Sequence, residues 1–176
     1  EKNGIRLPTV DKPWTKDEFG AVLATLKAAG YDTPIDIGAE DKGEWWPYAY
    51  SPFLQSFGGD LIDRSTMLTA DGALNGSDAV AWGTWFQNLF KDGYANANGT
   101  VGNQEFVDNK VALSYTGVWN ALASVDAVGD DLAILPPPDL GTGPKIGGGS
   151  WQWAISKGCN DADGARKYLE FSFQDK

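Results

Sequence analysis

Three stretches of this 176-residue chain carry no charged side chain, and most of its tryptophans lie in them. The stretches are 45–59, 111–125 and 146–156, where the chain average of 22% charged residues would place about nine charges. They hold five of the eight tryptophans, namely Trp45, Trp46, Trp119, Trp151 and Trp153. Burial in a core is one explanation, because the interior of a domain excludes unpaired charges.

Each stretch also places small or polar side chains beside its tryptophans. These neutral groups are Ser51, Gln55, Thr116, Asn120, Ser150 and Gln152. A tryptophan ring buries the C–H face of a sugar, while hydroxyls, amides and backbone groups match the hydroxyls of the sugar. The pattern therefore also fits a site for a polar, uncharged, ring-shaped ligand, and core packing and ligand binding both stay open.

The balance of charge excludes two classes of partner. The chain has 14 basic and 24 acidic residues, a net charge of −10 at pH 7, and its only adjacent basic residues are Arg166 and Lys167. We expect no nucleic-acid partner, because a phosphate backbone requires clustered Lys and Arg. The same charge opposes docking on an anionic membrane. No hydrophobic run is longer than four residues, so direct membrane insertion is not expected either.

Missing residue types exclude several kinds of site. Histidine is absent and Cys159 is the only cysteine. This removes Ser-His and Cys-His nucleophile pairs, metal sites built on His or clustered Cys, and any internal disulfide. The residue pattern of a calcium-binding EF-hand loop is also missing. We therefore expect no metal ion and no cofactor.

Helical and extended patterns alternate along the chain, which predicts the α/β class. Helices are predicted over 15–30, 47–57, 77–90, 103–109 and 161–171, with a short one after Gly117. Short strands are predicted over 33–37, 60–63, 111–115, 132–135 and 151–155, and a flexible loop over 140–149. The first helix has the clearest start, because Thr15 and Glu18 have the spacing of a capping box.

Two of these helices carry apolar positions that are predicted to face the core. In the helix over 77–90, with Ser77 as its cap, they are Ala81, Trp82, Trp85, Phe86 and Leu89. In the helix over 161–171 they are Ala165, Tyr168 and Leu169. The helical spacing of Trp82 and Trp85 indicates core packing rather than a ligand site.

Two tryptophan segments are candidates for a ligand site. Trp119 opens a helix directly after a predicted strand, and open α/β sheets bind ligands at the carboxyl ends of their strands. Trp45 and Trp46 stand at a helix entrance, and adjacent side chains cannot both point inward from a regular element. At least one of these two is therefore expected on a surface or in a cleft, with packing against the core as the alternative.

Glycines of the third stretch and two aspartates are further candidates. Gly147, Gly148 and Gly149 precede a predicted strand rather than a helix, and the Gly-Lys-Ser/Thr ending of a phosphate-binding loop is missing. Such glycines let the backbone approach a ligand or act as a hinge. Asp60 and Asp63 are either hydrogen-bond acceptors for a ligand or turn residues.

Six motifs follow one another along nearly the whole chain. They are Pro13-Trp14-Thr15 with Glu18-Phe19; Gly58-Gly59-Asp60-Leu61-Ile62-Asp63; Phe106-Val107 with Lys110-Val111-Ala112-Leu113; Gly117-Val118-Trp119-Asn120; Ile134-Leu135-Pro136 with Gly148-Gly149, Trp151 and Ala154-Ile155-Ser156; and Ala165, Lys167, Leu169, Glu170 and Phe171. In this order they resemble the extracellular solute-binding proteins of bacterial ABC sugar importers, the maltose-binding-protein-like family 1. Two positions depart from the family pattern, since Trp14 precedes Thr15 and Asn109 stands where Gly is usual.

The resemblance implies one lobe of a periplasmic-binding-protein-like, two-lobe (type II) fold, helix-rich with a small mixed sheet. Residues 1–130 would form most of the second, C-terminal lobe. Residues 131–176 would form a hinge-crossing strand, the glycine-rich loop, a strand and a helix that belong towards the first lobe. The chain would then be a fragment of a lipoprotein on the extracellular face of the cell membrane, or of a periplasmic protein, with its signal segment outside this sequence.

The same resemblance implies a non-catalytic protein that captures a mono- or oligosaccharide by domain closure and delivers it to the membrane permease of an ABC importer. The ligand-binding residues at matching positions are Trp45, Trp46, Trp119, Asn120, Gly149, Ser150 and Trp151, with Asp60 as a weaker candidate. No catalytic residue is expected.

A carbohydrate-active enzyme domain and a stand-alone carbohydrate-binding module are the alternatives. A glycoside hydrolase needs two carboxylates about 5 to 9.5 Å apart in a cleft. The uncharged stretches contain none, and only Glu44, Asp60 and Asp126 flank them. Stand-alone modules of this kind are mostly β-sandwiches, so a helix-rich fold would count against that alternative.

Overall fold

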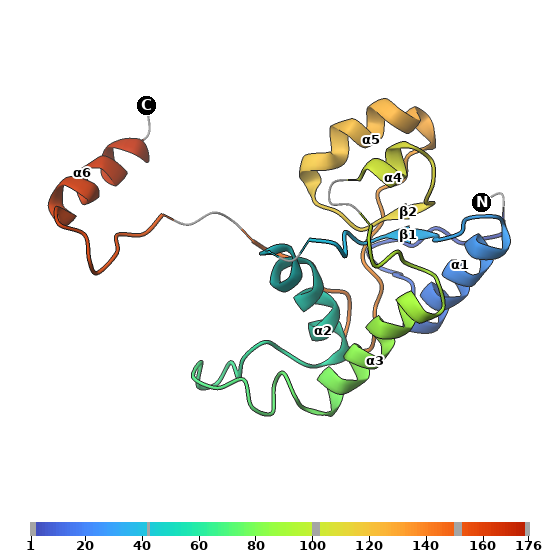
Figure 1. Ribbon diagram of the computed structural model, residues 1–176, viewed down its shortest axis with the longest axis horizontal. Coiled ribbons are helices and arrows are strands. Elements are labelled where there is room, and N and C mark those ends of the chain that lie inside the picture. Colours follow the sequence, from blue (N-terminus) through green and yellow to red (C-terminus); the bar gives the residue numbers. More distant parts are fainter. Residues whose placement is uncertain (1–2, 42, 100–102, 150–152, 175–176) are drawn as a thin grey trace.

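The structure is a computed structural model that describes residues 3–41, 43–99, 103–149 and 153–174. Its α-helices are α1 (Lys16–Ala28), α2 (Ser51–Phe57), α3 (Ser77–Lys91), α4 (Gln104–Val107), α5 (Ala121–Val128) and α6 (Ala162–Ser172). Shorter helical turns are η1 (Trp46–Tyr50), η2 (Val118–Asn120) and η3 (Gly129–Asp131). Figure 1 shows α1, α2 and α3 below a short central sheet, with α4 and α5 above it.

The sheet consists of strands β1 (Ile35–Asp36) and β2 (Leu113–Ser114), which run parallel. Ile35 lies opposite Leu113 and Asp36 lies opposite Ser114. Ile35 also forms a parallel bridge with Ala95, in the segment that follows α3. A small mixed sheet was the expectation, whereas every strand pairing in the described residues is parallel. The predicted strands over 33–37 and 111–115 are both present, in shorter form.

Helix α1 begins as its sequence predicts. The Thr15 hydroxyl accepts a hydrogen bond from the Glu18 amide (3.2 Å), and the Glu18 carboxylate accepts one from the Thr15 amide (2.9 Å). This capping box pairs two backbone donors that a helix start otherwise leaves free. Gly30 follows the helix with φ +109°, a conformation that favours glycine. The buried face of α1 consists of Phe19, Val22, Leu23 and Leu26.

The hydrophobic core gathers around β1. Its buried members come from α1, β1, η1, α2, α3 and the segments beside them, and include Trp14, Phe19, Leu23, Ile35, Ile37, Tyr50, Phe53, Phe86, Leu89 and Leu140. Trp82 and Trp85 of α3 are partly buried against this core, so their predicted packing is confirmed. The start of α3 differs from the prediction, because its cap is Gly76 rather than Ser77 and Ala79 is buried while Ala81 is exposed.

Three predicted strands differ from the described structure. The strands predicted over 60–63 and 132–135 are wrong, and the strand predicted over 151–155 is not formed by residues 153–155, the part of it that the structure describes. Residues 60–63 are irregular and lead into a turn at 64–66, where the Asp63 carboxylate accepts hydrogen bonds from the Ser65 amide (2.8 Å) and the Thr66 hydroxyl (2.9 Å). Residues 132–135 pair with no strand of the described chain, and the three prolines that follow have no N–H to donate. Residues 153–155 are also unpaired, and the rest of that predicted strand lies outside the described residues.

Residues 139–143 are tied to the start of the chain and to α2. The Asp139 amide donates to the Trp14 carbonyl (2.8 Å). The Ser56 hydroxyl accepts from the Leu140 amide (2.9 Å) and donates to the Gly143 carbonyl (2.8 Å). Because Ser56 and Leu140 are buried, this segment belongs to the same packed body as α1 and α2.

Helix α6 forms where the sequence predicts it, but its predicted inward face is not buried. Asp161 caps it by accepting from the Gly164 amide (2.8 Å). Ala165 and Leu169 are half-buried, and Tyr168 is 63% exposed. In Figure 1, α6 stands apart from the other helices, and no other helix of the described residues covers this face. No helix within the described residues is long and apolar enough to cross a membrane.

Candidate functional site

The first part of the candidate site comes from the entrance to α2. The predicted helix over 47–57 is present as two elements, since η1 (Trp46–Tyr50) is a π-helical turn that leads into α2 (Ser51–Phe57). Pro47 lies in the first turn of η1 and Pro52 in the first turn of α2, where a helix leaves its N–H groups unpaired in any case. The prolines therefore fit without breaking the helix. π-Helical turns are frequent at functional sites.

Trp45, Tyr48 and Trp119 form what we call the three-ring cluster. Ring centroids are 5.9 Å apart for Trp45 and Tyr48, 6.0 Å for Tyr48 and Trp119, and 6.2 Å for Trp45 and Trp119. These separations are those of aromatic rings in contact. Trp119 is 60% exposed, while Trp45 and Tyr48 are half-buried. The cluster thus presents an open indole beside two partly covered rings, and it joins the first two uncharged stretches.

The N–H edge of the Trp45 indole is held by a hydrogen bond to the backbone that follows β1. Its indole Nε1 donates to the carbonyl of Ile37 (3.0 Å), and the Tyr50 hydroxyl donates to the same oxygen (2.9 Å). Gly38 follows with φ +65°, and a Cβ atom there would lie 3.0 Å from Trp45 Nε1. The indole edge therefore rests directly on the turn that ends β1.

The glycine-rich segment covers part of Tyr48. A Cβ atom at Gly149 would lie 2.5 Å from Tyr48 Cε2, and one at Gly147 would lie 3.0 Å from the same atom. The backbone approaches the ring closely at both positions, which any larger residue would prevent. Gly149 is thus beside the cluster, whereas the predicted site residues Ser150 and Trp151 lie outside the described residues.

Asn120 follows Trp119 at the end of η2 and is half-buried. Its side-chain amide donates to the Thr116 hydroxyl (2.7 Å). Within the described part of the chain, its side-chain carbonyl oxygen accepts no hydrogen bond. Asn120 is therefore a neutral side chain next in sequence to Trp119, with a carbonyl oxygen that can accept a hydrogen bond.

Trp46 packs away from the three-ring cluster. Its ring meets Tyr50 edge-on at 5.2 Å and Phe86 of α3 at 6.3 Å, and it is 44% exposed. Of the two adjacent tryptophans, only Trp45 contacts the rings of Tyr48 and Trp119 in the described structure. The structure therefore separates two residues that the sequence placed in one site.

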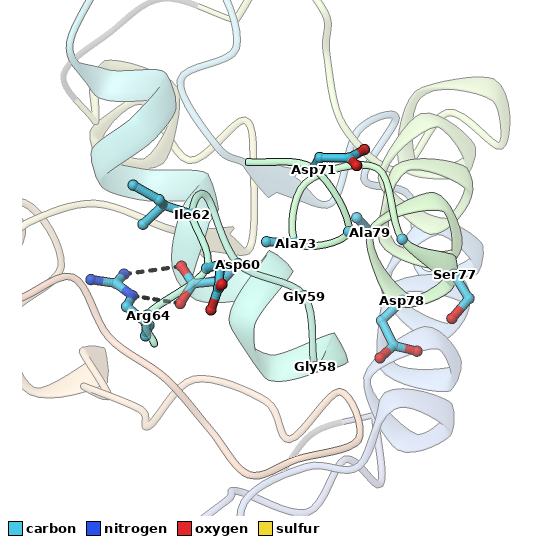
Figure 2. A pocket seen from close by; sticks show the side chains of 13 residues that line it. Gly58, Gly59, Asp60, Ile62, Arg64, Asp71, Ala73, Ser77, Asp78 and Ala79 are labelled. Carbon is cyan, nitrogen blue, oxygen red and sulfur yellow. Dashed lines mark hydrogen bonds and ion pairs between the residues drawn. The ribbon is translucent and has the colours of Figure 1, made fainter. Parts of the chain in front are cut away.

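Asp60 lies on the wall of a different hollow. Figure 2 shows it paired with Arg64. Asp60 lines a hollow of about 410 Å³ whose other walls include Asp71 and Asp78. Arg64 Nε lies 2.7 Å from one carboxylate oxygen of Asp60, and the hydrogen bonds from Arg64 lower the pKa of Asp60 to about 2. The Gln55 amide also donates to Asp60 (3.1 Å). None of the three clustered rings lines this cavity. The contacts of Asp60 stabilise the segment that follows α2.

The phenols of Tyr50 and Tyr115, near the three-ring cluster, are uncharged at ordinary pH. Burial raises the pKa of Tyr50 to about 12, and burial also raises the pKa of Tyr115, so both phenols stay protonated. Among the described residues, no group of three or more Asp, Glu or Cys side chains is arranged to hold a metal ion. Open and half-buried rings among neutral groups suit stacking on an uncharged ring-shaped ligand.

Tyr48 is a member of this site that the sequence analysis did not single out, whereas Gly147 belongs to the glycine segment that it named. Tyr48 lies in the first uncharged stretch, three residues after Trp45 and therefore close to one helical turn away. That spacing was the available signal. The contact between Gly147 and Tyr48 joins distant parts of the chain, and no local pattern indicates it.

Comparison with known proteins gives one family and one related fold. The family model described as "Bacterial extracellular solute-binding protein" matches residues 2–176. Among solved structures, a sugar transporter from Bacillus licheniformis in complex with stachyose is similar, with a TM-score of 0.63 and 18% sequence identity. The similarity covers 98% of this chain and 47% of that one, so this chain spans about half the length of that structure. No curated protein matches this chain.

Proposed function

Because the chain belongs to the bacterial extracellular solute-binding proteins, as its six motifs indicated, we propose that it captures a mono- or oligosaccharide for an ABC importer. The observation that carries this proposal is the three-ring cluster, in which the open indole of Trp119 adjoins the half-buried rings of Trp45 and Tyr48. The C–H face of a sugar ring stacks on such a surface. Asn120 and the backbone of the glycine-rich segment would match its hydroxyls.

We propose that the capture is non-catalytic. The uncharged stretches that supply the three rings contain no carboxylate, whereas glycoside hydrolysis requires a pair of carboxylates in the cleft. A stand-alone carbohydrate-binding module is also disfavoured, since such modules are mostly β-sandwiches and this fold is helix-rich. Solute capture therefore accounts for the fold and for the neutral aromatic surface together.

The division into lobes is part of the same proposal. Residues 1–130 would form most of the second lobe, and the chain would cross towards the first lobe within residues 131–176. The separate position of α6 in Figure 1 supports this division, as does a related structure about twice as long. Residues 139–143 still pack on α2, which supports a crossing that begins after them. Gly149, Ser150 and Trp151 would then approach the sugar from the crossing segment.

The partners and location follow from the family. We propose that the longer protein delivers its sugar to the membrane permease of an ABC importer. It would act outside the cytoplasm, either as a lipoprotein on the extracellular face of the membrane or in the periplasm. Trp46 and Asp60 stay candidate ligand residues, although the structure places both away from the three-ring cluster.

A sugar panel tests the proposed function. The chain and its longer parent protein are screened by thermal shift with stachyose, raffinose, maltose and glucose, because a ligand that binds only the folded state raises the melting temperature. The sugar with the largest shift is then titrated by calorimetry. We expect saturable binding by the parent protein and weaker binding by this chain, since part of the proposed cleft lies outside it. Absence of binding by the parent protein to every sugar of a broad panel would contradict the proposal.

A further inference from the structure

Asp36 is a buried carboxylate at the end of β1, and the proposed stacking of sugar does not involve it. Its side chain is 5% exposed, and its neighbours along the strand are Ile35 and Ile37. A charged group in such a place is retained only with a hydrogen-bonding partner. Among the described residues, the partner is the backbone amide of Gly38, which donates to Asp36 Oδ1 at 2.9 Å.

The amide that Asp36 holds belongs to the same peptide group as the carbonyl that holds Trp45. The Gly38 N–H and the Ile37 C=O are the two ends of one planar unit, so orienting one end orients the other. The Ile37 carbonyl accepts from Trp45 Nε1 at 3.0 Å and from the Tyr50 hydroxyl at 2.9 Å. A carbonyl oxygen has two lone pairs, and these two donors use both.

The turn also supports the ring sterically. Gly38 is buried with φ +65°, a left-handed conformation that an Asx turn stabilises. Its Cα lies under the indole, since a Cβ there would be 3.0 Å from Trp45 Nε1 and 3.4 Å from Trp45 Cε2. Trp45 in turn contacts Tyr48 and Trp119. One carboxylate, one peptide group and one indole thus connect the end of β1 to the three-ring cluster.

We infer that Asp36 is a positioning residue of the ligand site, which sets the orientation of Trp45 through the peptide group between Ile37 and Gly38. This inference rests on the proposed sugar site for its functional consequence. Burial also raises the pKa of Asp36, which agrees with a carboxyl group enclosed beneath the turn.

The chain supplies matched variants for the test. Asp36→Ala removes the hydrogen-bond acceptor, whereas Asp36→Asn keeps an oxygen atom at the same position in the side chain. Ser114→Ala is the control, because Ser114 lies opposite Asp36 across the sheet and its buried hydroxyl has no hydrogen-bond partner in the described structure. Asp36→Leu, which fills a similar space without a hydrogen-bond acceptor, is the second variant for the case in which Asp36→Ala does not fold.

The first readout needs no sugar. The indole N–H signal of Trp45 is assigned in a ¹H–¹⁵N spectrum with Trp45→Phe, and its hydrogen exchange is measured. We expect Asp36→Ala to shift this signal and to speed its exchange by about tenfold, while Asp36→Asn and Ser114→Ala leave it near the wild-type value. The indole of Trp14, which donates to the Arg6 carbonyl, reports any general loosening of the fold. An unchanged Trp45 signal in a folded Asp36→Ala or Asp36→Leu protein overturns the inference.

The second readout is stachyose affinity in the longer parent protein. We expect Asp36→Ala to weaken it by about tenfold and Asp36→Asn by less than about threefold. If Asp36→Ala and Asp36→Asn lose stachyose affinity equally, Asp36 does not act through its hydrogen-bond acceptor oxygen. If the wild-type protein does not bind stachyose, the indole signal still decides whether Asp36 positions Trp45, so failure of the sugar assignment and failure of this inference are distinguishable.

Discussion

The indole rings of Trp45 and Trp119 meet edge to face, with centroids 6.2 Å apart and planes inclined at 76°. The two residues come from separate uncharged stretches, one before α2 and the other before α5. Because Trp119 is open to solvent and Trp45 is anchored to the Ile37 carbonyl, one ring is available for stacking and the other supports it. A ligand that stacks on Trp119 would therefore bind to a preorganised surface.

Replacing Trp119 with alanine tests the open ring. Trp119 is 60% exposed, so its loss should change the free energy of unfolding little. It should weaken binding of the sugar that the panel identifies by about 1–3 kcal/mol, as expected for a large aromatic contact in a site. Calorimetric titration of the parent protein measures this loss. The control is Tyr168→Ala, which removes a similarly exposed ring on α6. Equal affinity in the Trp119 variant and the wild type removes Trp119 from the site.

The elements predicted most faithfully are those with local signals. The capping box of Thr15 and Glu18 forms as its spacing indicates, and Asp161 caps α6. Strands were predicted less well, because a strand exists only if a neighbour pairs with it. Residues 132–135 have the composition of a strand but no partner within the described chain, and the polar side chain of Asp63 closes a turn instead.

The candidate site was accessible from sequence only in part. Lack of charge identified the segments of Trp45 and Trp119, and the structure brings these two rings together. Whether they bind sugar stays a prediction. Tyr48 was not singled out, because its place in the cluster depends on the geometry of the π-helical turn. Asp36 could not be recognised from the sequence, because its inferred role depends on which backbone carbonyl accepts the hydrogen bond from the Trp45 indole.

Ser56 should matter for stability beyond its size. Its buried hydroxyl accepts from the Leu140 amide and donates to the Gly143 carbonyl. Ser56→Ala leaves the Leu140 amide buried and unpaired, which should lower the free energy of unfolding by about 1–3 kcal/mol. Urea unfolding followed by circular dichroism measures this. Ser51→Ala is the control in the same helix, because the Ser51 hydroxyl forms no hydrogen bond in the described chain. A loss no larger than that of the control would show that residues 139–143 do not depend on Ser56.

The pair of Asp60 and Arg64 predicts a specific dependence on acid. The pKa of Asp60 is lowered from 3.8 to about 2 by hydrogen bonds from Arg64, so the folded state favours the charged carboxylate. The stabilisation is therefore present above about pH 3.8 and is lost as the pH falls towards about 2. Solvent screening limits it to less than about 1 kcal/mol, because the Arg64 side chain is more than half exposed. Asp60→Asn should remove this part of the stability profile, measured by urea unfolding across that range, whereas Asp11→Asn, on an exposed segment, should retain it.

Gly149 and Gly148 offer the sharpest comparison at the site, because they are adjacent and differ in what a methyl group would meet. A Cβ at Gly149 would lie 2.5 Å from Tyr48 Cε2, whereas a Cβ at Gly148 would meet nothing within 4 Å. Gly149→Ala must displace the Tyr48 ring or the backbone, and overpacking of this kind costs about 1–3 kcal/mol. We expect it to lower both the melting temperature and the sugar affinity, and Gly148→Ala to change neither. If both variants lose affinity equally, the cause is stiffening of the glycine-rich segment, and the contact with Tyr48 does not shape the site.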